Sequence, residues 1–161
     1  MFPNGVDLGL FKPGDRSKAR SELGIIGDRF VIAFVGHFEE QKGLTCLLDA
    51  VQGLEQVALL LVGQGSIKVK DGGSVAFKGR LPHARIPLAL AAADIFVLPT
   101  RVEGSCNAVI EAIACGLPIV TSDGRYMDDI VDDGVAVRTD PMDVRAIREA
   151  IVVLMLSLIH I

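Results

Sequence analysis

The feature that most constrains the fold is a regular alternation of short apolar runs with longer stretches of helical character. This alternation is typical of a parallel sheet whose strands are joined by crossover helices, so the expected class is α/β, with about six strands flanked by helices. Four of the runs are apolar almost throughout, which predicts burial on both faces. The predicted strands span residues 30–36, 57–63, 74–79, 94–99, 117–122 and 134–139.

Five helices are expected around these strands, over residues 15–23, 44–51, 84–92, 106–115 and 141–155. Gly24, Gly53 and Gly116 directly follow three of them, where glycine can adopt the left-handed conformation that ends a helix. Only residues 64–73 separate the second strand from the third, which is about the minimum for a parallel crossover. Any helix there is expected to be vestigial or missing.

Length and composition indicate one domain in a reducing compartment. The chain has 161 residues, half of them apolar, which suffices for one hydrophobic core. Its basic residues are scattered and the net charge is -4, which argues against a nucleic-acid partner. Three cysteines without a CxxC pair and no targeting segment favour a cytoplasmic location. A peripheral position at the inner membrane face stays open for a full-length enzyme.

The last six residues of the chain are predicted to lie outside the domain. Residues 156–161, LSLIHI, match what one reading frame of a widely used transposon sequencing adapter would encode. We therefore expect the domain to span residues 1–155 and the last six residues to be a non-native tail. The alternative is that they continue the apolar helix IREAIVVLM.

The most informative segment for chemistry is EGSCNAVIE, which joins the fourth strand to the fourth helix. A glycine-containing turn and a helix start place backbone N–H groups and a positive dipole end at the carboxyl edge of the sheet, where a diphosphate can bind. Ser105 can cap this helix, and Glu111 leans back toward its start. Glu103 and Glu111 then bracket one small volume and can accept hydrogen bonds from sugar hydroxyls, which predicts a nucleotide sugar. Alternatively, both are solvated surface residues.

The order and spacing of several motifs resemble the retaining GT-B glycosyltransferases called glycosyl transferases group one, which are family 4-like. The resemblance runs from residue 3 to about residue 155, through PNGVD, VGHFEEQKG, LVGQG, VAFKGRLP, AADIFVLPTRVEG, AIACGLPIVTSDG and DDIVDDGVAVRTDP. It implies a Rossmann-like domain, the C-terminal nucleotide-sugar-binding half of a GT-B fold, with the N-terminal acceptor domain absent. It also implies transfer of a hexose, with retention, from a nucleoside diphosphate sugar to a glycan or lipid-linked acceptor. The isolated fragment is expected at most to bind the donor.

The same resemblance implies roles for individual residues. Glu111 would hold the ribose hydroxyls, and Glu103, beside the donor sugar, would be one catalytic residue. The other would be Lys42, which would open the helix after the first strand and stabilise the departing nucleoside diphosphate. No metal or cofactor is expected, because Lys42 and the helix end replace a divalent cation. The remaining nucleotide-sugar-binding residues would be Gly36 and His37 after the first strand, Gly79 and Arg80 against the base, and the turn Gly104, Ser105, Cys106, Asn107 and Ala108.

The chain differs from this family at one residue, His37, and in the length of one segment, residues 64–73. An arginine usually follows the glycine of the first strand, and here the residue is His37. Neutral imidazole cannot make the bidentate phosphate contact of a guanidinium, so His37 either binds as a cation, weakens the clamp or has a structural role in the loop. The second departure is the short 64–73 segment, where such enzymes usually place a helix flanking the base. It leaves the identity of the base open.

Two other classes of function are compatible with parts of the sequence. A non-catalytic nucleotide-binding domain would share the fold and most of the motifs. A nicotinamide-dependent dehydrogenase is suggested by Gly63 and Gly65 after an apolar strand, but Lys68 stands where a third glycine is required. His83 and His160 have no neighbours at metal-ligand spacing, so no metal site is predicted. Cys106 and Cys115 are interpreted as packing residues.

Overall fold

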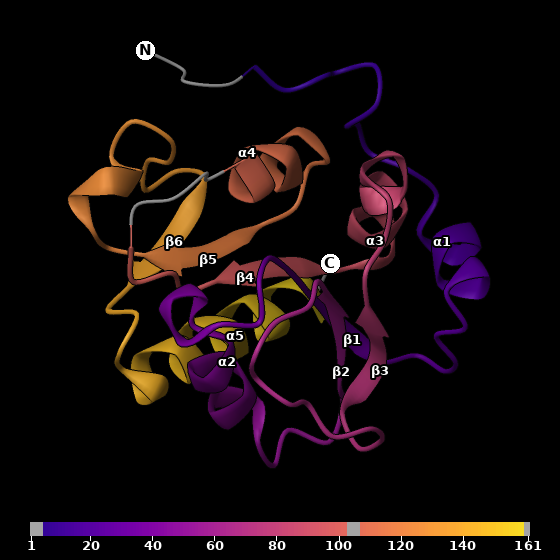
Figure 1. Ribbon diagram of the computed structural model, residues 1–161, viewed down its shortest axis with the longest axis horizontal. Helices are drawn as coiled ribbons and strands as arrows, with labels where there is room; N and C mark the ends of the chain where they lie inside the picture. The colour runs from indigo at the N-terminus through magenta and orange to yellow at the C-terminus, as the bar shows by residue number, and fades with distance from the viewer. Residues whose placement is uncertain (1–4, 103–106, 160–161) are drawn as a thin grey trace.

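The sheet at the centre of the molecule has six parallel strands in the order β3-β2-β1-β4-β5-β6 (Figure 1). The computed structural model describes residues 5–102 and 107–159. Each observed strand lies within its predicted run, which confirms the α/β class. The strands are β1 Phe30–Val35, β2 Val57–Val62, β3 Val75–Gly79, β4 Ile95–Leu98, β5 Ile119–Ser122 and β6 Ala136–Thr139.

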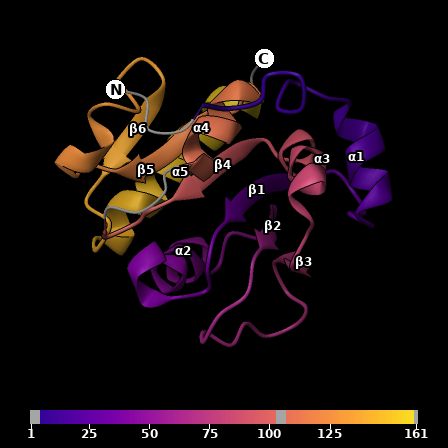
Figure 2. The ribbon, with the colours of Figure 1, turned by 45° about the horizontal axis from the view of Figure 1, so that its top comes forward.

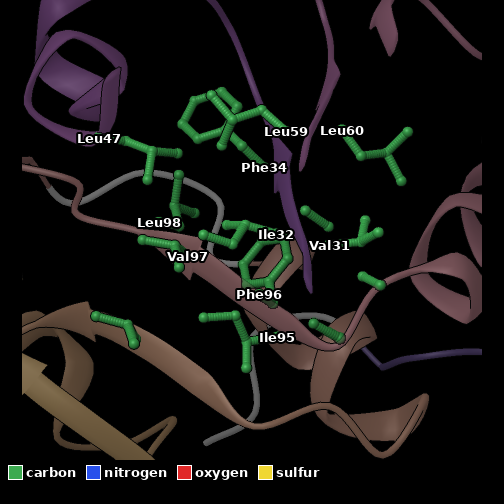
Figure 3. Close-up of a cluster of buried hydrophobic side chains, with 14 of the residues drawn as sticks. Val31, Ile32, Phe34, Leu47, Leu59, Leu60, Ile95, Phe96, Val97 and Leu98 are labelled. Atoms are coloured by element: carbon green, nitrogen blue, oxygen red, sulfur yellow. The ribbon is translucent and has the colours of Figure 1, made fainter. Parts of the chain in front are cut away.

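Burial along the strands confirms which of them lie inside the sheet. All residues of β2, β4 and β5 are buried, and in β1 only Val35 is partly exposed. The edge strands β3 and β6 are more exposed, because each has a neighbour on one side only. Figure 3 shows the resulting cluster, in which apolar side chains of β1, β2 and β4 gather with Leu47 of α2.

Helices cover both faces of the sheet. On one face α2 (Leu44–Val51) packs against α5 (Val144–Ile159). On the other lie α3 (Ile86–Ala92), against which α1 (Arg16–Glu22) packs, and α4 (Asn107–Ala114) (Figures 1 and 2). Gly24, Gly53 and Gly116 have φ values of 72°, 82° and 81°, so the three predicted glycine ends are confirmed. Residues 64–73 contain no helix, also as predicted.

Two helices have bounds that differ from the prediction by more than one residue. The segment expected as one helix over 84–92 begins as the 3-10 turn η2, His83–Arg85, and becomes α-helical at Ile86, with Pro87 in the first turn, where its missing N–H costs nothing. The last helix starts at Val144, because Asp143 caps it through the amide of Ala146 at 3.0 Å. It continues to Ile159, beyond the predicted domain end at residue 155. The proposed origin of residues 156–161 stays a prediction.

The topology places the candidate site at one edge of the sheet. Since all strands are parallel, the segments that follow β1, β2, β3 and β4 leave from the same carboxyl edge. The strand order reverses between β1 and β4, so the chain leaves these two strands in opposite directions and opens a crevice, the usual ligand site of such sheets. In the described part of the chain no helix is both long and apolar enough to cross a bilayer.

Candidate functional site

Glycines form a smooth floor where β1 and β2 end. A Cβ built on Gly63, which has φ 148°, would lie 1.8 Å from the carbonyl oxygen of Gly36, and one on Gly65 would lie 2.5 Å from that of Phe38. The amide of Gly63 donates to the carbonyl of Gly79 at the end of β3, at 2.9 Å. Only glycine at position 63 lets the three strand ends meet so closely.

A cavity of about 240 Å³ opens above this floor. Its lining includes three residues that were predicted to bind the nucleotide sugar, Gly36, His37 and Arg80, together with Gln64 and Ile86. Gly79 precedes Arg80 and is tied to the floor by the bond to Gly63. The structure therefore brings together segments predicted to contact the phosphates and the base. It does not distinguish the phosphate role of His37 from a structural one.

Lys42 lies in a different local structure from the one predicted. It was expected to open the helix after β1, but it ends the 3-10 turn η1, Glu40–Lys42, and α2 begins only at Leu44. The reason is Gly43, whose left-handed φ of 80° separates the turn from the helix. Lys42 is partly buried at this junction.

The turn that carries Lys42 is bonded to the chain that leads from β4 toward α4. The amide of Arg101 donates to the carbonyl of Gln41 at 2.7 Å, and the Thr100 hydroxyl donates to the same carbonyl at 3.3 Å. The carbonyl of Thr100 also accepts from the Tyr126 hydroxyl at 2.6 Å. Lys42 thus lies at the reversal of the strand order, beside the connection that was predicted to bind the diphosphate.

Glu111 lies in the second turn of α4, and its side chain is only 13% exposed. Its Oε1 is 3.0 Å from Nε2 of His83, in the turn after β3. Asn107 and Ala108 open α4 and are partly buried. The other predicted residues of this segment, Glu103, Gly104, Ser105 and Cys106, lie outside the described residues, so their proposed roles stay predictions.

Two site-adjacent residues were missed by the sequence analysis, His83 and Glu39. Glu39 joins the loop after β1 to the loop after β2, because its Oε2 accepts from the Ser66 hydroxyl at 2.6 Å and its Oε1 from the Ser66 amide at 3.0 Å. This contact holds the 64–73 segment against the site in place of a crossover helix. A glutamate in the first loop and a serine in the next, both at the carboxyl edge, are the signal that could have found the pair.

The Ser66 hydrogen bonds should be visible in the titration of Glu39. The hydroxyl bond, the amide bond and the nearby His37 charge lower the pKa of Glu39 below its ordinary 4.5, against the opposing effect of burial. Because the pKa is lower in the folded state, the stabilisation is present above the unfolded value and is lost as the pH falls through the folded value. We expect Ser66→Ala to raise the pH midpoint of the Glu39 titration, measured by NMR of the Glu39 carboxyl carbon. Ser17→Ala on α1 is the control, and equal midpoints in wild type and Ser66→Ala would contradict the assignment.

Cys115 is not suited to act as a nucleophile, and the described residues form no metal centre. Burial and the charge of Glu111 raise the pKa of Cys115 to about 11, against a backbone hydrogen bond from Lys12, so this thiol stays protonated and packs as a small apolar group. No three His, Cys, Asp or Glu side chains of residues 5–102 and 107–159 lie together as a metal site would require. The expectation that no metal or cofactor takes part stays a prediction.

Comparison with known proteins finds a family match over most of the chain. The family described as "Glycosyl transferases group 1" matches residues 29–157. The D-inositol 3-phosphate glycosyltransferase of Segniliparus rotundus is 35% identical over 139 residues, which cover 76% of this chain and 31% of that protein. The protein of the same name from Mycobacterium leprae is 35% identical over 145 residues, 81% of this chain and 34% of its own length. The chain thus spans about a third of these relatives.

Solved structures share the fold over nearly the whole chain. Sucrose-phosphate synthase from Thermosynechococcus elongatus superposes with a TM-score of 0.82 at 28% identity, covering 96% of this chain and 43% of that one. The Anabaena protein HepE, crystallised in complex with UDP, gives a TM-score of 0.82 at 26% identity, covering 96% of this chain and 47% of that one. HepE was also crystallised with UDP-glucose. In each of these structures the present chain corresponds to less than half of the whole.

Proposed function

Because the chain belongs to the family of glycosyl transferases group 1, we propose that it is the donor-binding domain of a retaining glycosyltransferase. The enzyme moves a hexose from a nucleoside diphosphate sugar to a glycan or lipid-linked acceptor. Uracil is the base we favour, since HepE, which is similar to this chain, was crystallised with UDP and UDP-glucose. The sugar acceptor is bound mainly by the part of the enzyme that this chain does not contain.

The observation that carries the proposal is the arrangement at the carboxyl edge of the sheet. The lining of the cavity above the glycine floor includes His37 after β1 and Arg80 after β3, the two strands that flank β2, which suits a base and its diphosphate. The turn of Lys42 is bonded through Gln41 to the connection from β4 to α4. In the proposal, Lys42 in the segment after β1 and the amino end of α4, which follows the neighbouring strand β4, supply positive charge to the crevice between these strands.

The proposed chemistry follows from this distribution of charge. The acceptor oxygen bonds to the anomeric carbon as the bond from that carbon to the diphosphate breaks, and the proton of the acceptor hydroxyl passes to an oxygen of the departing diphosphate. Negative charge develops on the departing nucleoside diphosphate, where Lys42 and the backbone N–H groups of residues 104–108 stabilise it. Glu103 lies beside the donor sugar and Glu111 holds the ribose. No step requires a metal ion.

The structure bears on the alternative functions. The loop with Gly63 and Gly65 does not open a helix, so it lacks the helix end that binds the pyrophosphate in dehydrogenases. Membership in the glycosyltransferase family also disfavours a dehydrogenase. A non-catalytic domain that binds the same nucleotide sugar remains the second candidate, because His37 replaces the arginine usual in the family.

Calorimetric titration of the 161-residue chain with UDP, GDP, ADP and NAD tests the proposal. We expect a measurable affinity for UDP and a weaker one for the other diphosphates, because the similar protein HepE was crystallised with UDP. We expect no affinity for NAD, because the loop with Gly63 and Gly65 does not open a helix. Binding of NAD in preference to every nucleoside diphosphate would contradict the transferase assignment. Transfer to an acceptor, measured with the full-length enzyme, would separate it from the non-catalytic alternative.

A further inference from the structure

His83 meets the carboxylate of Glu111 across two segments that are far apart in the sequence. It begins the turn η2 after β3, and its Nε2 lies 3.0 Å from Oε1 of Glu111 on α4. The His83 side chain is 68% exposed and that of Glu111 only 13% exposed. The imidazole therefore covers one oxygen of a carboxylate that is otherwise largely enclosed by the protein.

The imidazole ring is itself held in place from behind. It packs on the ring of Phe11, with centroids 5.3 Å apart and planes inclined by 57°. Phe11 is 1% exposed and is anchored by its amide, which donates to the carbonyl of Asp7 at 2.8 Å. An exposed histidine would otherwise sample several rotamers. Here the contact with a buried ring restricts it to an orientation in which Nε2 faces Glu111.

The direction of the hydrogen bond follows from the chemistry of the two groups. An ionised carboxylate can only accept, so Nε2 of His83 donates to Oε1. Among the described residues, His83 is the only hydrogen-bond partner of the Glu111 carboxylate. Its second oxygen, Oε2, accepts no hydrogen bond from residues 5–102 or 107–159, and in the inference below it accepts from a ligand hydroxyl. A carboxylate held through one oxygen presents the other in a defined direction.

We propose that His83 is a positioning residue for the donor, which holds the Glu111 carboxylate so that Oε2 accepts hydrogen bonds from the ribose hydroxyls. The inference rests on the proposed function, in which Glu111 binds ribose. It extends the site to His83, the first residue of η2, which follows the segment around Arg80 that is proposed to face the base. His83 thus contacts Phe11 on one side and the proposed ribose-binding carboxylate of Glu111 on the other.

The test is a comparison of two ligands, UDP and 2′,3′-dideoxyuridine 5′-diphosphate, by calorimetry on the 161-residue chain. His83→Phe keeps an aromatic ring on Phe11 but removes the donor, and should weaken UDP binding by about five- to tenfold. His83→Gln can place an amide N–H near the same oxygen and should recover most of the affinity. Neither change should alter binding of the dideoxy ligand, which has no ribose hydroxyls for Glu111 to hold. Arg85→Gln is the matched control, because Arg85 lies in the same turn but pairs with Glu22 of α1 at 4.0 Å. It should bind both ligands as wild type does.

The possible outcomes separate this inference from the function on which it rests. If wild type binds UDP and His83→Phe binds it equally well, or weakens both ligands by the same factor, the positioning role is overturned and the donor-binding function stands. If wild type binds no nucleoside diphosphate, the proposed function falls first. A loss that is confined to UDP and recovered in His83→Gln supports the role, since a general structural defect would affect both ligands.

Discussion

Gly43→Ala is expected to lower the free energy of unfolding by about 3–5 kcal/mol, whereas Gly53→Ala should lower it by only about 1–2 kcal/mol. Both glycines have nearly the same left-handed backbone, with φ 80° and 82°. A Cβ on Gly43 would lie 2.1 Å from the carbonyl oxygen of Pro99, while a Cβ on Gly53 meets nothing within 4 Å. The difference between the variants therefore isolates the contact between η1 and the end of β4.

Urea denaturation of both variants and wild type, followed by circular dichroism, measures this difference. Gly53→Ala is the matched control, because it carries the same backbone strain without the clash. The clashing atom is the backbone oxygen of Pro99, which directly follows the buried strand β4. The strand cannot move away without disturbing the core. Equal losses for the two variants would mean that the close approach at Pro99 does not constrain the turn of Lys42.

Glu111→Ala is expected to weaken UDP binding by on the order of 1–3 kcal/mol, about five- to 150-fold. The side chain is 13% exposed and bonded to His83, so the carboxylate is held ready for a ligand rather than mobile in solvent. Its removal takes away the acceptor proposed for the ribose hydroxyls and leaves the diphosphate contacts in place. Calorimetric titration with UDP measures the loss.

Glu55→Ala is the control for Glu111→Ala, because Glu55 is exposed in the turn before β2, at the opposite edge of the sheet. It should bind UDP as wild type does. Glu111→Gln keeps the shape of the side chain and one acceptor oxygen, and should fall between wild type and Glu111→Ala. An affinity for UDP that is the same in Glu111→Ala and wild type would remove Glu111 from the ribose role.

The strands and helices could be predicted from the sequence because their signals are local. An apolar run such as FVIAFV is buried on both faces only in the middle of a sheet, and a glycine such as Gly116 ends a helix wherever it lies. The missing crossover helix followed from the short 64–73 segment alone. The carboxyl edge of the sheet as the place of the site also followed, since parallel topology brings the strand ends together.

The side-chain contacts of the site could not be predicted in the same way. His83 and Glu111 are bonded, but nothing in either segment specifies the other, and His83 was judged only by the absence of metal-ligand spacing. The family resemblance placed Lys42 at the start of the helix over 44–51, whereas the left-handed Gly43, close to Pro99, separates Lys42 from that helix. Such contacts depend on how distant segments pack, which residue periodicity does not encode.

The reversal of strand order between β1 and β4 also bears on how the sheet forms. Within each half, pairing joins nearby parts of the chain, as Leu60 to Phe77 and Ile119 to Ala136, while the seam joins Ile32 to Ile95. Closing the longer loop costs more chain entropy, so the two three-stranded halves should associate late. The crevice between β1 and β4 lies on their seam, so a folding intermediate with only the β1–β3 half formed would hold His37 and Arg80 together without Glu111.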